Sequence, residues 1–330
     1  MPDEDALSAP NPVSLTVLTP SRMLAVGLLI VFAVAFASLG SGAFGQSRPP
    51  TPQGQIRVEV SLVNVLASVL DRNNRPASNL TRDQFQIYEE GKLQKIEVFE
   101  PETQQPLDLV LMMDTSLSEI ADLSFESEAA ANFIGQVVRP GDRVAIFEFA
   151  DRVTQLSGFS DNLRQLQSAV RNVGAGDGTA LYDAVYLGSQ ALAKGEAGRR
   201  RAIVLITDAG ETTSRADFET ARLEALRTES LLYTIVVRPV KGENGRNTAG
   251  EHALETIADS TGGAMYFPRE LSQLASMFEQ INLELRTQYR LGYYPQPRPT
   301  PGVYRKIEVR VVGDYSVRYR KAYYSGGPGG

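Results

Sequence analysis

The sequence contains no cysteine and only one histidine, His252, among its 330 residues. The lack of cysteine excludes disulfides, thiolate zinc sites and cysteine nucleophiles, and a single histidine excludes nearly all histidine-based catalysis. We expect His252, which follows a Gly- and Asn-rich stretch, to be exposed or to cap a helix. Any metal bound by this protein must therefore be held by oxygen ligands.

Positive charge is also not in excess. The formal net charge of -6 provides no general attraction to the phosphates of nucleic acids, so we predict no nucleic-acid partner. The one dense basic block is Arg199-Arg200-Arg201, which precedes an apolar run and is predicted to be a solvated strand entrance. Because 42% of the residues are hydrophobic, the chain is globular and long enough for one large or two modest domains.

The first part of the chain predicts export. Residues 1–22 form an N-terminal region, and residues 23–45 form an uncharged apolar run with small residues at its end. This length lies between that of a signal-peptide core and that of a spanning helix, so a cleaved signal peptide and a transmembrane segment both remain open. The protein would be periplasmic, extracellular or anchored by one N-terminal transmembrane helix. Residues 46–55, rich in Pro and polar residues, are predicted to be a linker.

Residues 106–287 show the alternation of an α/β domain. Continuous apolar runs, typical of strands covered on both faces, occupy 107–113, 144–149, 202–207 and 231–237. Helix-length segments lie between and after them, at 125–138, 163–173, 180–193, 218–229, 251–260 and 271–289. The pattern predicts a doubly wound, mostly parallel, Rossmann-like sheet with right-handed crossovers.

The segments on either side, 56–105 and 288–324, alternate apolar and polar residues as half-buried strands do. We predict a first strand near Ile56, and a hairpin whose two strands join at Glu90-Gly91 and continue through Ile96. A few such strands cannot form a stable domain alone. The two segments are therefore expected to share one β-sandwich, with the α/β domain inserted between them, and residues 325–330 are expected to form a disordered tail.

Polar side chains follow two of the buried strands. LVLMMDTSLSE delivers Asp114 and then Ser116 and Ser118 at alternating positions, and AIVLITDAGE places Asp208 at the end of another strand. Between them, Thr179 lies on a Gly-rich loop just before a helix. Ligands of open α/β sheets gather beyond the carboxyl ends of the strands. We therefore predict that these five side chains converge.

Two carboxylates and three hydroxyls form a set of hard oxygen donors, which suits Mg²⁺ or Mn²⁺. Neutral hydroxyls leave much of the charge of the cation uncancelled. An Asp or Glu carboxylate of a protein partner could therefore fill an open position on the metal. The donor set predicts a site for metal-dependent adhesion.

These residues resemble the metal-ion-dependent adhesion site of the von Willebrand factor A family, and the resemblance covers roughly residues 106–287. It implies direct metal contacts for three hydroxyls, those of Ser116, Ser118 and Thr179. It implies that Asp114 and Asp208 act directly or through water.

The resemblance extends beyond the donor set. Asp183, one helical turn after Thr179, resembles an Asp of the family that supports the metal-binding loop. The strands on both sides of residues 106–287 are similar to those of an exported bacterial, acidobacterial-type family related to von Willebrand factor A.

The sequence departs from the pattern of the family at three positions. Leu117 and Glu119 stand where Gly and Met are frequent, and Ala209 stands where Gly is common. Glu119 would add negative charge beside the metal, which would weaken the attraction of a partner carboxylate or substitute for it.

Other interpretations remain open at this point. Asp114 or Ser118 could cap a helix or build a turn, and Asp177 is expected to order its loop. The protein could be an envelope scaffold whose metal is structural or absent. A Mg²⁺-dependent hydrolase is a further alternative, but aspartate-based phosphoryl transfer usually needs a second carboxylate where Ser116 stands. We therefore predict that the protein is not an enzyme.

Overall fold

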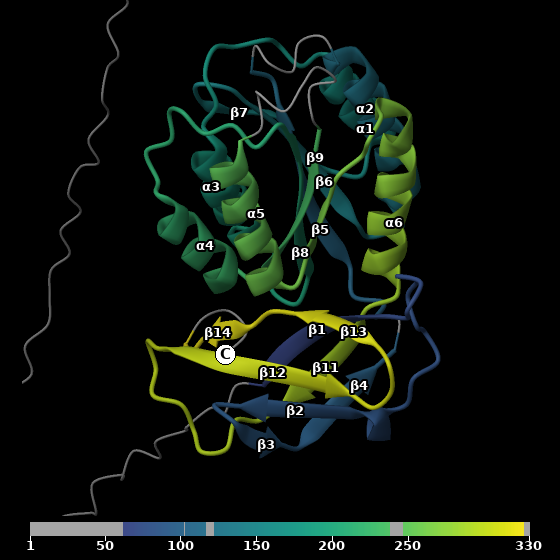
Figure 1. Ribbon diagram of the computed structural model, residues 1–330, viewed down its shortest axis with the longest axis vertical. Helices are drawn as coiled ribbons and strands as arrows, with labels where there is room; N and C mark the ends of the chain where they lie inside the picture. Colours follow the sequence, from purple (N-terminus) through teal and green to yellow (C-terminus); the bar gives the residue numbers. More distant parts are fainter. Residues whose placement is uncertain (1–61, 102, 117–121, 238–246, 327–330) are drawn as a thin grey trace, which may run out of the picture. The chain divides into compact units, whose positions relative to one another are not determined.

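The computed structural model describes residues 62–101, 103–116, 122–237 and 247–326 (Figure 1). The predicted leader, linker, strand near Ile56 and C-terminal tail from 327 onward lie outside these residues. No helix in the ranges that the structure describes is long and apolar enough to cross a membrane.

A six-stranded sheet forms the centre of the α/β part, in the order β10-β9-β8-β5-β6-β7. Its strands are β5 (Leu107–Asp114), β6 (Arg143–Phe149), β7 (Val153–Ser160), β8 (Arg200–Thr207), β9 (Ser230–Val236) and β10 (Ala264–Tyr266). All neighbours pair in parallel except β6 and β7. Every residue of β5, β8 and β9 is buried, which explains why these strands have continuous apolar sequences.

Helices cover both faces of this sheet (Figure 1). The first face carries α1 (Leu123–Val137), α2 (Leu163–Arg171) and α6 (Leu274–Arg286); the second carries α3 (Leu181–Ala193), α4 (Phe218–Arg227) and α5 (Thr248–Thr261). Alternate residues of β5 enter the two cores: Leu109 and Leu111 lie in the first, and Val110 and Met112 in the second. The predicted doubly wound, mostly parallel α/β fold is confirmed.

The remaining strands form two antiparallel sheets of four strands each, in the orders β13-β1-β11-β4 and β14-β12-β2-β3. Their bounds are β1 (Val63–Leu70), β2 (Phe85–Glu89), β3 (Lys92–Gln94), β4 (Ile96–Glu100), β11 (Tyr289–Tyr293), β12 (Tyr304–Val311), β13 (Ser316–Tyr319) and β14 (Ala322–Tyr324). Side chains from both sheets meet in one core, with Val65 and Tyr289 from the first and Ile87 and Val309 from the second. This packing is that of a β-sandwich built from both ends of the described chain.

Two local predictions about strands and helices were wrong. The hairpin turns at Glu90-Gly91 as predicted, and both residues have positive φ angles, but the strand that pairs with β2 across this turn is the short β3. Ile96 begins β4, which pairs with β11 in the other sheet. The last predicted helix, 271–289, ends at Arg286, and Tyr289 opens β11 instead.

The prediction of a solvated basic strand entrance was also wrong. Arg200 is 3% exposed and Arg201 is 7% exposed. Arg200 Nε donates a hydrogen bond of 2.9 Å to the carbonyl of Gln105, and Arg201 Nη1 donates one of 3.0 Å to the carbonyl of Thr228. These two side chains are therefore buried because they donate hydrogen bonds to backbone carbonyls near the amino end of β8.

Candidate metal centre

The carboxyl ends of β5 and β8 bring two predicted metal ligands to one edge of the central sheet. Asp114 is the last residue of β5, and Asp208 follows the last residue of β8. The two strands are parallel neighbours, in register from Leu107 opposite Arg200 to Met113 opposite Ile206. Their polar end groups must therefore lie near each other.

Asp114 is fully buried and its carboxylate is held on both oxygens. Oδ2 accepts a hydrogen bond of 2.6 Å from the hydroxyl of Thr207, and Oδ1 accepts one of 3.0 Å from the backbone N–H of Ser116. Burial, with a smaller contribution from the negative charge of Asp208, raises the pKa of Asp114 to about 6. The two hydrogen bonds act in the opposite direction and lower this pKa. The buried carboxylate is thus oriented, and it has no cationic partner among the residues that the structure describes.

Backbone pairing brings the segment after β5 to the Gly-rich loop. Ser116, which is 3% exposed, forms a parallel β-bridge with Gly176, and the N–H of Gly176 donates to the carbonyl of Thr115 at 2.9 Å. The N–H of Thr115 in turn donates to the carbonyl of Phe149 at the end of β6, also at 2.9 Å. The Asp–x–Ser segment and the loop that carries Thr179 are therefore joined directly.

Thr179 is fixed through its backbone while its hydroxyl remains available. Its N–H donates to the hydroxyl of Thr212 at 2.8 Å, and its carbonyl accepts from the N–H of Thr212 at 2.9 Å. The Thr179 hydroxyl forms no hydrogen bond with another residue that the structure describes. A rigid backbone with an unused hydroxyl is suited to binding a ligand.

Gly210 shows how closely the polar atoms approach one another. A Cβ atom at this position would lie 2.9 Å from Asp208 Oδ1, 3.3 Å from Thr179 Oγ1 and 3.6 Å from Asn247 Nδ2. Oxygens from two separate loops therefore face the same small space. The N–H of Gly210 also donates to Asp208 Oδ1 at 2.7 Å, which orients that carboxylate.

A reciprocal set of hydrogen bonds joins helix α3 to the loop after Asp208. The carboxylate of Asp183 accepts from the N–H groups of Arg215, at 3.1 Å, and Ala216, at 2.8 Å. In the other direction, Glu211 Oε2 and the Ser214 hydroxyl accept from the free N–H groups at the start of α3. Asp183 thus holds the loop that follows Asp208.

Ala209 occupies a conformation that favours glycine. Its φ angle is +64°, and its side chain is fully buried. Such a conformation costs a residue with a Cβ atom about 1 kcal/mol. Helix α5 packs directly over it, because a Cβ atom at Gly250 would lie 1.9 Å from the carbonyl oxygen of Ala209. Alanine is therefore tolerated in place of glycine at residue 209, and the packing of α5 holds the loop in this conformation.

Ser118 and Glu119, together with Leu117, lie outside the described residues. The structure therefore brings together Asp114, Ser116, Thr179 and Asp208 from the predicted set. Thr207, Thr212 and Glu211, whose side chains hold the donors in place, were not predicted from the sequence. Thr207 had one usable signal, since it is a polar residue at the end of an otherwise apolar buried strand.

The chemistry of these residues fits a divalent cation. The donors are carboxylate and hydroxyl oxygens, the ligand types that Mg²⁺ and Mn²⁺ prefer. No group of three or more His, Asp or Glu side chains suited to a metal occurs among the described residues, and the predicted donors include only two carboxylates. Hydroxyls would have to supply the rest of the ligands.

The fold and the site together define the class: a doubly wound α/β domain with an oxygen-rich cluster at the carboxyl edge of its sheet. The family model described as von Willebrand factor type A domain matches residues 109–211. Residues 109–211 therefore form part of a von Willebrand factor type A domain. No curated protein matches the sequence at a significant level.

Solved structures include several similar folds. The conserved hypothetical protein BatB from Bacteroides thetaiotaomicron is 15% identical, with a TM-score of 0.44, and the match covers 55% of this chain and all of that one. A von Willebrand factor type A protein from Catenulispora acidiphila is 11% identical, with a TM-score of 0.49 and coverages of 82% and 76%. The corresponding domain of the type V pili tip protein Mfa5 from Porphyromonas gingivalis is 12% identical, with a TM-score of 0.45 and coverages of 55% and 95%.

Proposed function

We propose that this protein is an exported binding module that uses a metal ion to recognise an acidic group of a protein partner. In this proposal Mg²⁺, or Mn²⁺, is held by oxygen atoms of Asp114, Ser116, Ser118, Thr179 and Asp208. The observation that carries the proposal is the cradle beside Gly210, where Asp208 Oδ1 and Thr179 Oγ1 face one space. Domains of the von Willebrand factor type A family are generally interaction modules.

The donor set explains why such a metal would attract a partner. Hydroxyl ligands are neutral, so a divalent cation held by them keeps much of its charge. A carboxylate from an Asp or Glu of another protein gains a strong, short-range attraction when it completes the coordination. Glu119 stands in the same segment as Ser118 and would modulate that attraction.

A binding role is favoured over an enzymatic one by the residues around Asp114. Ser116 stands two residues after it, where a second carboxylate would serve as the acid or base of phosphoryl transfer. His252, the single histidine, is exposed on α5, and its carbonyl accepts a hydrogen bond of 2.8 Å from the hydroxyl of Thr256. We infer export from the apolar segment 23–45 of the sequence.

A comparison of partner capture with and without metal tests the proposal. The full chain is immobilised and incubated with an envelope extract in Mg²⁺ or in excess chelator. The Thr179→Val variant is run in parallel, because valine keeps the shape and removes only the hydroxyl. Thr256→Val, a change at a partly exposed threonine of α5, serves as the matched control.

We expect partners to be retained in Mg²⁺ by the wild type and by Thr256→Val. The same partners should be lost in chelator or with Thr179→Val. Partners retained equally under all four conditions would instead support the envelope scaffold, whose metal is structural or absent.

A further inference from the structure

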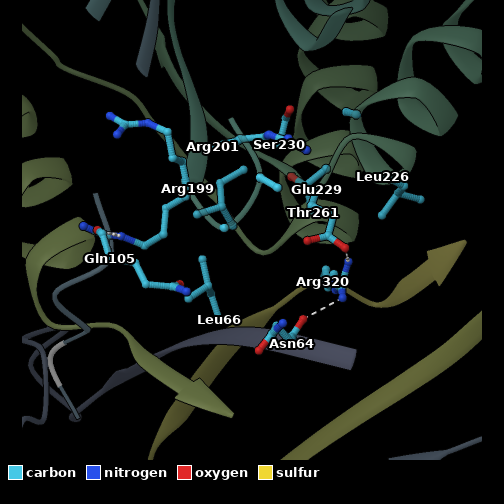
Figure 2. A pocket seen from close by; sticks show the side chains of 15 residues that line it. Asn64, Leu66, Gln105, Arg199, Arg201, Leu226, Glu229, Ser230, Thr261 and Arg320 are labelled. Carbon is cyan, nitrogen blue, oxygen red and sulfur yellow. Dashed lines mark hydrogen bonds and ion pairs between the residues drawn. The ribbon is translucent and has the colours of Figure 1, made fainter. Parts of the chain in front are cut away.

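A cavity of about 100 Å³ lies at the amino-terminal end of β8 (Figure 2), whereas Asp114 lies at the carboxyl end of the neighbouring strand β5. Its walls combine both parts of the described fold. Arg200 and Arg201 come from β8, and Glu229 follows α4. Leu66 on β1 and Arg320 after β13 come from the β-sandwich.

The cavity lining carries more positive than negative charge. Four arginines line it, namely Arg199, Arg200, Arg201 and Arg320, against one carboxylate, that of Glu229. Arg199 is neutralised by Asp108, with 2.7 Å between Nε and Oδ1. Arg200 and Arg201 have no carboxylate partner among the residues that the structure describes, and burial beside Arg286 lowers the pKa of Arg200 to about 10. The buried positive charge at this site is thus incompletely compensated.

Two of these arginines also have unused hydrogen-bond donors. The Nε atoms of Arg201 and Arg320 are buried and donate to no atom in the described part of the chain, although the two residues are only 7% and 6% exposed. Arg320 lies between Glu229, with 2.6 Å from Nη1 to Oε1, and the carbonyl of Asn64, with 2.5 Å from Nη2 (Figure 2). Buried charged donors without an acceptor are unfavourable, so an anion at this position would be stabilising.

The lining also has an apolar part. Leu66, Leu226 and Leu231 contribute to the walls beside the arginines. The volume here is smaller than that of a cavity of about 150 Å³ that holds benzene in a well-studied protein, so a single ring is the upper limit for the apolar body. The site therefore combines a cationic side with a small apolar one.

We propose that this cavity binds a small organic anion, in which one carboxylate or phosphate group is attached to an apolar body no larger than a single ring. The anionic group accepts hydrogen bonds from the guanidinium groups of Arg201 and Arg320. The apolar body packs against Leu66, Leu226 and Leu231. This site is separate from the metal centre and does not depend on it.

Calorimetric titration of the full chain with two probes, benzoate and phenyl phosphate, tests this assignment. Benzamide, a neutral molecule of the same shape as benzoate, is the ligand control. We expect saturable binding of at least one anion and binding of benzamide that is at least about tenfold weaker, because only the anion compensates the buried charge. The stronger of the two probes identifies the anionic group.

Two variants change the cavity charge in opposite directions. Arg201→Met removes a cation and an unused donor, and we expect it to weaken anion binding by at least about tenfold. Glu229→Gln removes the competing carboxylate beside Arg320, and we expect it to strengthen binding. Arg310→Met, an exposed arginine outside the cavity, is expected to leave binding unchanged.

The opposite signs keep the test decisive even if one variant folds poorly. A melting curve shows whether each variant folds. Equal binding of benzoate and benzamide, no binding of either anion, or weaker binding by Glu229→Gln would each overturn the proposal. The arginines would then serve only to hold the backbone carbonyls that they contact.

Discussion

The hydroxyl of Thr207, at the end of β8, donates a hydrogen bond of 2.6 Å to Oδ2 of Asp114, at the end of β5. The same hydroxyl oxygen accepts from the N–H of Ala209 at 3.0 Å. One side chain thus orients the buried carboxylate of the first polar segment and fixes the backbone of the second. The relative positions of Asp114 and Asp208 depend on this threonine.

Replacing Thr207 with valine should weaken both the fold and the metal site. Valine preserves the shape but leaves Asp114 Oδ2 and the N–H of Ala209 without their partner in the protein interior. We expect the free energy of unfolding to fall by about 2 kcal/mol. Urea denaturation measures this loss, and Thr256→Val on the surface should change stability by less than about 0.5 kcal/mol. Equal stabilities of the two variants would contradict the role assigned to Thr207.

Gly210→Ala should impair the metal site more than the fold. The added Cβ would lie 2.9 Å from Asp208 Oδ1 and 3.3 Å from Thr179 Oγ1, so one of these oxygens must move. We expect Mg²⁺ affinity to fall at least about tenfold, which is about 1.4 kcal/mol. Titration calorimetry measures the affinity. Unchanged Mg²⁺ binding would show that the space beside Gly210 is not the metal position.

The control for this change is another glycine-to-alanine substitution. Gly135 is exposed within α1, and a Cβ atom there would lie 3.4 Å from its nearest neighbour, Gln167 Nε2. Gly135→Ala should leave Mg²⁺ affinity unchanged and raise the free energy of unfolding by up to about 1 kcal/mol, because alanine favours the helix.

Gly250→Ala should have the opposite effect on stability from Gly135→Ala, although both glycines lie in helices. Helix propensity alone predicts a gain of about 1 kcal/mol at either position. At Gly250, however, the new Cβ would lie 1.9 Å from the carbonyl oxygen of Ala209, so α5 or the loop must shift. We expect a net loss of about 1 to 3 kcal/mol by thermal or urea unfolding. A stabilised Gly250→Ala protein would contradict the close packing of α5 over the loop.

Much of the fold could be predicted because each core strand is buried on both faces. The runs that became β5, β8 and β9 needed only local sequence to be recognised, and the helices between them had suitable lengths. Asp114 and Asp208 could be placed at one sheet edge for the same reason. Parallel strands of this length bring their carboxyl ends together whatever the loops contain.

The parts that could not be predicted depend on pairings between distant segments. Ile96 follows a hairpin in sequence, but β4 joins β11, which lies almost two hundred residues later. Strand β7 has a mixed sequence, VTQLSGFS, at the edge of the sheet, where one side needs no apolar cover. Arg200 and Arg201 were predicted to be surface residues, because the local sequence does not show which backbone carbonyls they contact.

The supporting residues of the site were missed for a related reason. Thr212 and Glu211 are ordinary polar residues in a loop, and their roles arise only when that loop lies against Thr179 and the start of α3. The donors themselves could be recognised because their spacing after buried strands is unusual.

The most direct test of the proposed metal centre is Mg²⁺ binding by the full chain, compared between the wild type and Thr179→Val. Binding to the folded state alone raises stability, by about 2.7 kcal/mol at a Mg²⁺ concentration 100 times the Kd. The account predicts one Mg²⁺ per wild-type chain, a melting temperature that falls on addition of chelator, and loss of both effects in Thr179→Val. No bound metal by elemental analysis, together with a melting temperature that chelator leaves unchanged, would contradict it.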